Sequence, residues 1–340
     1  MKKIGIFAGA FIAVVALLVV LGGREPSSQA EAATIGPTIE TSRFTREDIR
    51  FPCGNATCAG WLYLPRNQAN PPVVVMGQGL TGLRKDLIPG FAETFAANGI
   101  AAFAFDYRYF GDSGGSPRNL ADPQRQLTDW RAAISYVRAT PEIDGDRLGL
   151  WGTSMSGGLV LELGATEENV GAIVAQIPGV DSEAERLGLQ TNATMIFRVL
   201  TAISVDHVKS IYSDEAFEIS TFGDPKDFAM FSDAQTMIDI EPLRQQNPTP
   251  RKIAGRSLPK LNAYNPREFW DDVNAPILIM ASETDRLSPI EPIRELAEAR
   301  NDIVTLELFD GHHFSLYEPS QTAWAAQRQV DFFLTKLAER

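Results

Sequence analysis

The sequence predicts a fold of the α/β class, in which a mostly parallel sheet is flanked by helices. Three observations predict it. Short β-branched apolar runs alternate with stretches whose apolar residues recur every three or four positions. The links between them are short, as the right-handed crossovers of a parallel sheet require. Of the 340 residues, 44% are apolar, which is enough for a substantial core in one or two domains.

The first half of the chain carries most of this alternation. Residues 24–42 contain Pro and Ser and are interpreted as a linker. A helix is expected where Leu87, Phe91 and Phe95 recur at four-residue spacing, ending at a glycine. The other predicted elements are strands 44–52, 59–64, 72–76, 100–105, 148–151 and 170–177, and helices 127–137 and 156–166.

The alternation breaks between about residues 181 and 273. This stretch has Phe and Met residues among polar residues and prolines, with no clear strand pattern. We interpret it as a mainly helical cap inserted over the strand ends. Regular elements then resume with a strand at 275–280, a helix opened by the capping pattern Ser288-Pro-Ile-Glu, a strand at 303–309 and a final amphipathic helix.

The N-terminus has the composition of an export signal. A basic start at residues 1–3 precedes the 20 uncharged residues 4–23, and Ala30-Glu-Ala matches a cleavage site. The apolar run is long enough to span a bilayer, so both a cleaved signal peptide and a retained membrane anchor over residues 1–33 fit. Either places residues 34–340, the predicted catalytic domain, outside the cytoplasm. The uniform apolarity argues against a buried core helix.

Charge and cysteines exclude several classes of partner. The net charge of −12 would repel nucleic acid and an anionic membrane surface. Cys53 and Cys58 bracket a short loop between two strand-like runs, which fits a disulfide across a hairpin in an exported protein. Their neighbourhood holds too few ligands for zinc, and we expect neither a metal nor a cofactor.

Residues 147–158 contain the strongest functional motif. Ser154 lies between the small residues Gly152 and Ser156, directly after a short strand and before a helix. A strand that turns sharply into a helix has room only for small side chains two positions either side of the turn, which is the pattern of a nucleophile elbow. Ser156 also has small neighbours, but the predicted strand end at Trp151 favours Ser154 as the nucleophile.

A serine nucleophile needs a base and an acid that orients the base. The chain has three histidines, of which His207 falls in the predicted cap and His312 and His313 follow the last strand. For the acid we favour Asp285, which follows the strand at 275–280, over Glu283. The resulting order of serine, aspartate and histidine is that of one large group of hydrolases.

Two further motifs were weighed. The glycine-rich segment 77–82 follows a strand, so the backbone N–H groups of Leu80 and Met155 are predicted to form an oxyanion hole. Ser113 also lies in a G-x-S-x-G pattern. A trypsin-like arrangement requires a histidine before the serine, and no histidine precedes Ser113. Pro117 follows Ser113 where a nucleophile elbow would have a helix, so we assign Ser113 to a loop.

These segments resemble the α/β-hydrolase superfamily, and within it bacterial dienelactone-hydrolase-like and serine-aminopeptidase-like hydrolases. The similarity runs from about residue 59 to the C-terminus. It is carried by Val-Val-Val-Met-Gly-Gln-Gly, Ala-Phe-Asp-Tyr-Arg-Tyr-Phe-Gly-Asp-Ser-Gly-Gly-Ser-Pro-Arg, Leu-Trp-Gly-Thr-Ser-Met-Ser-Gly-Gly and Gly-His-His-Phe-Ser-Leu-Tyr. The resemblance implies Ser154 as nucleophile, Asp285 as acid and the insert as a substrate-covering cap. Its Gly-His-Phe loops align with His313, which favours this residue over His312 as base.

The chain departs from the family pattern at two positions. Gln78 stands where many relatives have His, and Ser156 replaces the usual second glycine of the elbow. We expect a serine hydrolase that cleaves a small-molecule carboxylic ester through an acyl-enzyme. An exported peptidase would use the same triad. A non-catalytic binding protein of this fold would be expected to lack a triad member, and this chain has all three.

Overall fold

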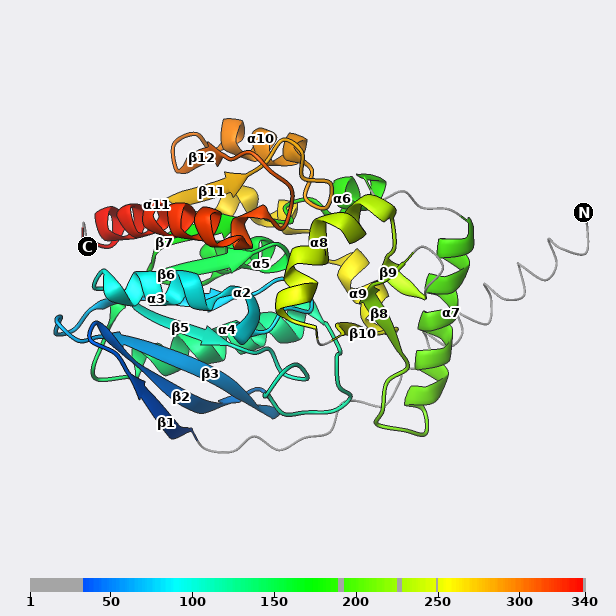
Figure 1. The fold of residues 1–340 in the computed structure, drawn as a ribbon, viewed down its shortest axis with the longest axis horizontal. Coiled ribbons are helices and arrows are strands. Elements are labelled where there is room, and N and C mark those ends of the chain that lie inside the picture. Colours follow the sequence, from blue (N-terminus) through cyan, green and yellow to red (C-terminus); the bar gives the residue numbers. More distant parts are fainter. Residues whose placement is uncertain (1–32, 189–192, 225–227, 249, 339–340) are drawn as a thin grey trace, which may run out of the picture.

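The computed structural model describes residues 33–188, 193–224, 228–248 and 250–338 (Figure 1). Its main sheet has nine strands in the order β1-β2-β3-β5-β4-β6-β7-β11-β12. Pairing is antiparallel from β1 through β5 and parallel from β5 through β12. The strands are β1 (Thr34–Glu40), β2 (Phe44–Cys53), β3 (Ala56–Pro65), β4 (Pro72–Gly77), β5 (Ala101–Phe105), β6 (Asp144–Thr153), β7 (Val170–Gln176), β11 (Ile277–Ala281) and β12 (Val304–Leu308).

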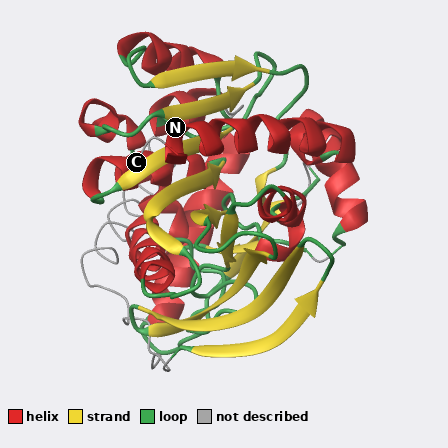
Figure 2. Ribbon diagram, turned by 90° about the vertical axis from the view of Figure 1, so that its left-hand side faces the viewer, coloured by secondary structure: helices red, strands yellow, loops and turns green. Residues whose placement is uncertain are grey.

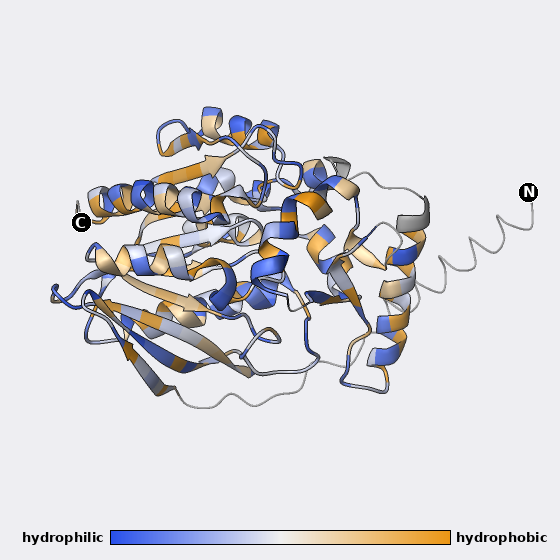
Figure 3. Cartoon of the chain, viewed as in Figure 1, coloured by the Kyte–Doolittle hydropathy of each residue, from blue (hydrophilic) through white to orange (hydrophobic). Residues whose placement is uncertain are grey.

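Helices cover both faces of this sheet (Figure 2). One face packs against α3 and α11, where Phe95 and Phe333 meet edge to face with ring centroids 5.6 Å apart. The other packs against α4, α5 and α10. Apolar and polar residues alternate along α11, so that one side of it is buried (Figure 3). The helices are α2 (Arg84–Leu87), α3 (Pro89–Ala97), α4 (Pro123–Arg138), α5 (Met155–Thr166), α10 (Ile290–Ala299), α11 (Pro319–Ala338) and the 3-10 turn η2 (Ser315–Tyr317).

The predicted elements of the sheet and its helices are present, with one region interpreted wrongly. Part of the predicted linker 24–42 is strand β1, which pairs antiparallel with β2 at the edge of the sheet. All seven of its residues are exposed. Because neither face is buried, the strand has no alternation of apolar and polar residues from which it could be recognised.

The hairpin of β2 and β3 contains the expected disulfide, between Cys53 and Cys58. Both cysteines are fully buried, and the bond ties the end of β2 to the start of β3.

The insert between β7 and β11 lies beyond the carboxyl ends of the parallel strands (Figure 1). It is mostly helical, and it also contains strands for which the sequence shows no clear pattern, because β10, β8 and β9 form a small sheet. These strands have three to five residues, too few to show a period of two in the sequence. The insert comprises α6 (Ser182–Gly188), α7 (Ala193–Ser210), β8 (Glu218–Phe222), β9 (Ala229–Phe231), α8 (Ala234–Gln246), β10 (Lys252–Ala254), α9 (Ser257–Ala263) and the 3-10 helix η1 (Pro266–Asp272).

The predicted signal peptide or anchor falls on residues 1–32, outside the described residues, and on residue 33. Among the described residues, no helix is both long and apolar enough to cross a bilayer.

Candidate active site

Ser154 lies at the sharp turn between β6 and α5. Its backbone has φ 56° and ψ −121°, an unusual conformation for a non-glycine residue. A Cβ at Gly152 would lie 2.1 Å from the carbonyl oxygen of Ser156, and one at Gly157 would lie 2.6 Å from Pro178. The turn therefore requires glycine at both positions. It lifts the Ser154 hydroxyl above the sheet, at the start of α5.

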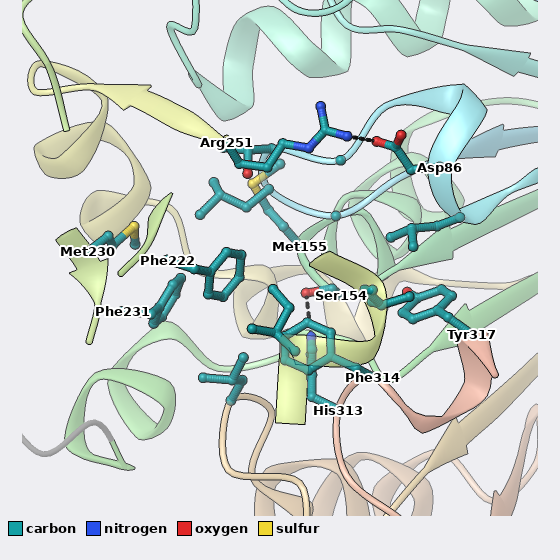
Figure 4. A pocket seen from close by; sticks show the side chains of 18 of the residues that line it. Asp86, Ser154, Met155, Phe222, Met230, Phe231, Arg251, His313, Phe314 and Tyr317 are labelled. Carbon is teal, nitrogen blue, oxygen red and sulfur yellow. Dashed lines mark hydrogen bonds and ion pairs between the residues drawn. The ribbon is translucent and has the colours of Figure 1, made fainter. Parts of the chain in front are cut away.

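Ser154, His313 and Asp285 form a continuous hydrogen-bonded relay, of which Figure 4 shows the bond between Ser154 and His313. His313 Nε2 lies 3.0 Å from Ser154 Oγ, and His313 Nδ1 lies 2.8 Å from Asp285 Oδ2. A carboxylate accepts and does not donate, so Nδ1 carries a proton and Nε2 is free to accept the serine proton. Residues far apart in the chain meet because β6, β11 and β12 all end at the same edge of the sheet.

The loop after β11 fixes the Asp285 carboxylate. Its Oδ1 accepts the backbone N–H of Leu287 at 2.8 Å and of Ser288 at 2.9 Å, which leaves Oδ2 for the histidine. The Asp285 side chain is 1% exposed. Three hydrogen bonds fix the orientation of this buried carboxylate, so the imidazole is held in one tautomer and one position.

The residues weighed against these three lie elsewhere. His312 Nδ1 accepts the backbone N–H of Phe314 at 3.2 Å, and Glu283 is an exposed side chain paired with Arg294. Ser113 is buried, where its hydroxyl accepts the N–H of Ala59 at 2.8 Å and donates to a backbone carbonyl at 2.6 Å. His207 belongs to α7. None of the four takes part in the relay.

The predicted oxyanion donors flank the serine. Leu80, Met155 and Ser154 line the same cavity. Met155 is the first residue of α5, where backbone N–H groups have no partner within the helix. A Cβ at Gly79 would lie 3.1 Å from Ser154 Cβ, so glycine lets the loop approach the nucleophile. The start of α5 places the positive end of the helix dipole beside Ser154.

A buried hydrogen-bond chain behind the elbow was not predicted from the sequence. Trp130 Nε1 donates to the Tyr107 hydroxyl at 2.8 Å, Tyr107 donates to the Ser156 hydroxyl, and Ser156 donates to the carbonyl of Gln78. Burial raises the pKa of Tyr107 above its usual range. These hydrogen bonds connect α5 to the loop that carries Leu80. The signal in the sequence was Ser156 itself, a hydroxyl at the position where the family resemblance implies glycine.

A cavity of about 570 Å³ extends from Ser154 between the sheet edge and the insert (Figure 4). Most of its wall is apolar: the insert contributes Phe222, Met230, Phe231, Ile240 and Leu243, and the core contributes Leu80, Leu87, Phe314 and Tyr317. Three acidic residues also line it. Asp86 of the core pairs with Arg251 of the insert. Glu241 lies 3.7 Å from Arg244, and Glu185 belongs to α6. Sequence reasoning missed all three.

Among the described residues, one cluster has the composition of a metal site, formed by Cys53, Cys58 and Asp129. Its two sulfurs are bonded to each other, and Asp129 pairs with Arg108 at 2.6 Å. The cluster is therefore structural and lies apart from the relay.

The sheet order, the elbow and the position of the relay residues define the class of α/β hydrolases. The chain belongs to the family described as serine aminopeptidase S33, or Hydrolase_4, whose model matches residues 73–319.

Curated relatives and solved structures agree with this assignment. The quorum-quenching protein AidA of Acinetobacter baumannii strain MDR-ZJ06 is 30% identical over 286 residues, which cover 84% of this chain and 93% of AidA. A thiohydrolase of Eupenicillium brefeldianum is 24% identical over 84% of this chain and 93% of its own length. The fold matches the α/β hydrolase GrgF from Penicillium with a TM-score of 0.72 at 22% identity, over 86% of this chain and 99% of GrgF. Hypothetical protein PA2218 from Pseudomonas aeruginosa also matches with a TM-score of 0.72, at 21% identity over 89% of this chain and 99% of PA2218.

Proposed function

We propose that this hydrolase cleaves carboxylic esters through an acyl-enzyme, with Ser154 as nucleophile, His313 as base and Asp285 as the orienting acid. The observation that carries the proposal is the relay in which His313 bonds to Ser154 at 3.0 Å and to Asp285 at 2.8 Å, at the floor of an apolar cavity.

The chemistry follows from the positions of these atoms. His313 Nε2 takes the hydroxyl proton as Ser154 Oγ attacks the ester carbonyl, and the N–H groups of Leu80 and Met155 hold the resulting oxyanion. The tetrahedral intermediate collapses, and the imidazolium gives its proton to the leaving alcohol. Water then loses a proton to His313 and attacks the acyl-enzyme, which releases the acid and restores the serine.

The cavity supports a small-molecule substrate with an apolar acyl or alcohol group. Aromatic and Met side chains from the insert line the cavity that contains Ser154. An apolar substrate chain would bury these side chains and would therefore bind more tightly than a polar one. Relatives named thiohydrolase support including a thioester, because a thiol leaves from the same tetrahedral intermediate.

A second candidate is a peptidase, favoured by the description of the family as serine aminopeptidase. The same relay can cleave an amide, provided that His313 protonates the leaving amine. An ester with an uncharged acyl group and an aminoacyl amide, assayed side by side, distinguish the two.

The test uses p-nitrophenyl esters of increasing acyl length, a thioester and an aminoacyl p-nitroanilide. We expect ester turnover by the wild type and a loss of kcat of about 10⁴-fold or more in Ser154→Ala. His312→Ala is the matched control, a neighbouring histidine that should keep near wild-type turnover. Undiminished ester hydrolysis by a folded Ser154→Ala protein rejects the proposal, and turnover of the anilide alone favours the peptidase.

We also propose that the domain works outside the cytoplasm, on the basis of the uncharged run at residues 4–23 after a basic start. Cell fractionation tests this, and N-terminal sequencing of the mature protein distinguishes cleavage after Ala32 from a retained anchor. Recovery of full-length protein from the cytoplasm rejects it.

A further inference from the structure

Glu185, on the first helix of the insert, faces the catalytic cavity. It lines this cavity together with Ser154 and His313. A Cβ built on Gly179 would lie 2.7 Å from Glu185 Oε1, and the Gly179 N–H donates to the Ser154 carbonyl at 3.0 Å. The carboxyl therefore lies beside the backbone segment that supports the nucleophile, and the relay does not use it.

The charges around Glu185 are mainly negative. Of the described acidic residues in the wall, Asp86 and Glu241 have arginine partners, and among the side chains that the structure describes no ion pair joins a cation to Glu185. Its ionisable neighbours are Asp181, which pairs with Arg267 at 3.0 Å, and Asp285 of the relay, and His313 and Tyr264 line the same cavity.

A carboxyl in this position is held in its neutral form. Burial in an apolar wall, followed by the negative charges of Asp181 and then Asp285, raises the pKa of Glu185 to about 8. A protonated carboxyl has one O–H donor in addition to its acceptor capacity. An uncharged acceptor on a ligand can use that donor, whereas a ligand ammonium group requires the ionised form.

We propose that Glu185 donates a hydrogen bond to an uncharged oxygen of the substrate next to the scissile ester. This inference rests on the proposed ester hydrolysis and narrows the substrate class to neutral esters with a second acceptor, an ether or carbonyl oxygen, close to the reacting carbonyl. In a largely apolar cavity such a donor discriminates strongly, because a substrate without the acceptor leaves it unpaired.

Two isosteric substitutions separate hydrogen bonding from shape. Glu185→Gln keeps a donor and removes the titration, and Glu185→Leu keeps the approximate size and removes the donor. The substrates are matched pairs that differ by one ether oxygen: p-nitrophenyl methoxyacetate against butyrate, and the 2-methoxyethyl against the butyl ester of one acid. All proteins are full-length, and their thermal unfolding is compared.

We expect wild type and Glu185→Gln to prefer the ether-bearing member of at least one pair, and Glu185→Leu to lose about tenfold of that preference in kcat/KM. The wild-type preference falls as the pH rises through about 8, where Glu185 ionises, while that of Glu185→Gln stays flat. If Glu185→Leu does not fold, this pH comparison decides.

Equal preferences in all three proteins overturn the inference. So does a selective loss of aminoacyl ester turnover in Glu185→Gln, because that result assigns the ionised carboxylate to an ammonium group. Labelling of Ser154 by a fluorophosphonate is measured in parallel. Absence of labelling in wild type removes the proposed function itself, whereas intact labelling with no effect at residue 185 removes only the role of Glu185.

Discussion

The sheet edge and the insert contribute to the cavity in different ways. On the sheet edge, Ser154 lies at a strained turn, and two backbone N–H groups hold the Asp285 carboxylate, whose side chain is 1% exposed. The insert contributes apolar side chains on short elements such as β8 and β9, the ion pair of Arg251 with Asp86 in the cavity wall, and Glu185. We therefore propose that the scaffold fixes the reacting atoms and that the insert determines which substrates reach them.

The largest effect tests the scaffold side of this comparison. Asp285→Asn keeps the shape but can donate an amide hydrogen toward His313, which favours the wrong tautomer. We expect kcat to fall about 10³- to 10⁴-fold with little change in KM. Glu283→Gln, an exposed neighbour in the same loop, is the control and should stay near wild type in steady-state ester kinetics. A decrease of less than tenfold in Asp285→Asn would contradict the orienting role.

A smaller effect is expected behind the elbow. Ser156→Ala removes the hydroxyl that holds the Gln78 carbonyl, so the Leu80 N–H loses its fixed position. We expect kcat to fall about 10- to 100-fold with KM nearly unchanged. Tyr107→Phe leaves the Ser156 bond to Gln78 in place and should lower kcat less. Two results would show that the hydrogen-bond chain does not act through the loop that carries Leu80. One is a rise in KM for Ser156→Ala as large as its fall in kcat, and the other is a greater loss of kcat in Tyr107→Phe than in Ser156→Ala.

Changes in the insert should affect binding more than chemistry. Phe222 lines the cavity and packs against Phe231 and Phe314, with ring centroids 5.3 and 5.8 Å away. We expect Phe222→Ala to raise KM for long-chain esters about five- to tenfold, with kcat within about threefold. Phe228→Ala, in the same insert, is the control. A larger effect on kcat than on KM would break the division between scaffold and insert.

The smallest effect is on stability. Glu185 has a raised pKa in the folded protein, so its contribution to stability is complete below the unfolded pKa of about 4.3 and is lost as the pH rises toward 8. Glu185→Gln lacks this loss. The melting temperature of the variant relative to wild type should therefore increase by a few degrees between pH 5 and pH 8.5. A difference that stays constant across this range would contradict a neutral Glu185 in the fold.

Elements that are buried on at least one face and long enough to show a pattern could be predicted from sequence, and the other elements could not. The helix of Leu127 and Trp130 and the buried strand at 72–76 have clear patterns. Strand β1 is exposed on both faces, and β8, β9 and β10 are too short for periodicity.

The candidate site follows the same rule. The elbow could be predicted from Gly152 and Ser154. Asp285 and His313 could be predicted because they follow predicted strands, and the ends of parallel strands meet at one edge of the sheet. Glu185 and the partners of Ser156 could not be predicted, because their positions depend on contacts between segments far apart in the sequence. Glu185 lies beside Gly179, and Ser156 donates a hydrogen bond to the carbonyl of Gln78.

The most direct test of the central claim is to trap the acyl-enzyme. Wild-type protein is mixed with a slowly deacylating p-nitrophenyl ester, quenched in acid, digested and mapped by mass spectrometry. We expect one acyl group per chain on Ser154 and a burst of p-nitrophenol of equal size, and we expect neither in Ser154→Ala. An acyl group on Ser113 or Ser156, or a burst that persists in Ser154→Ala, would contradict it.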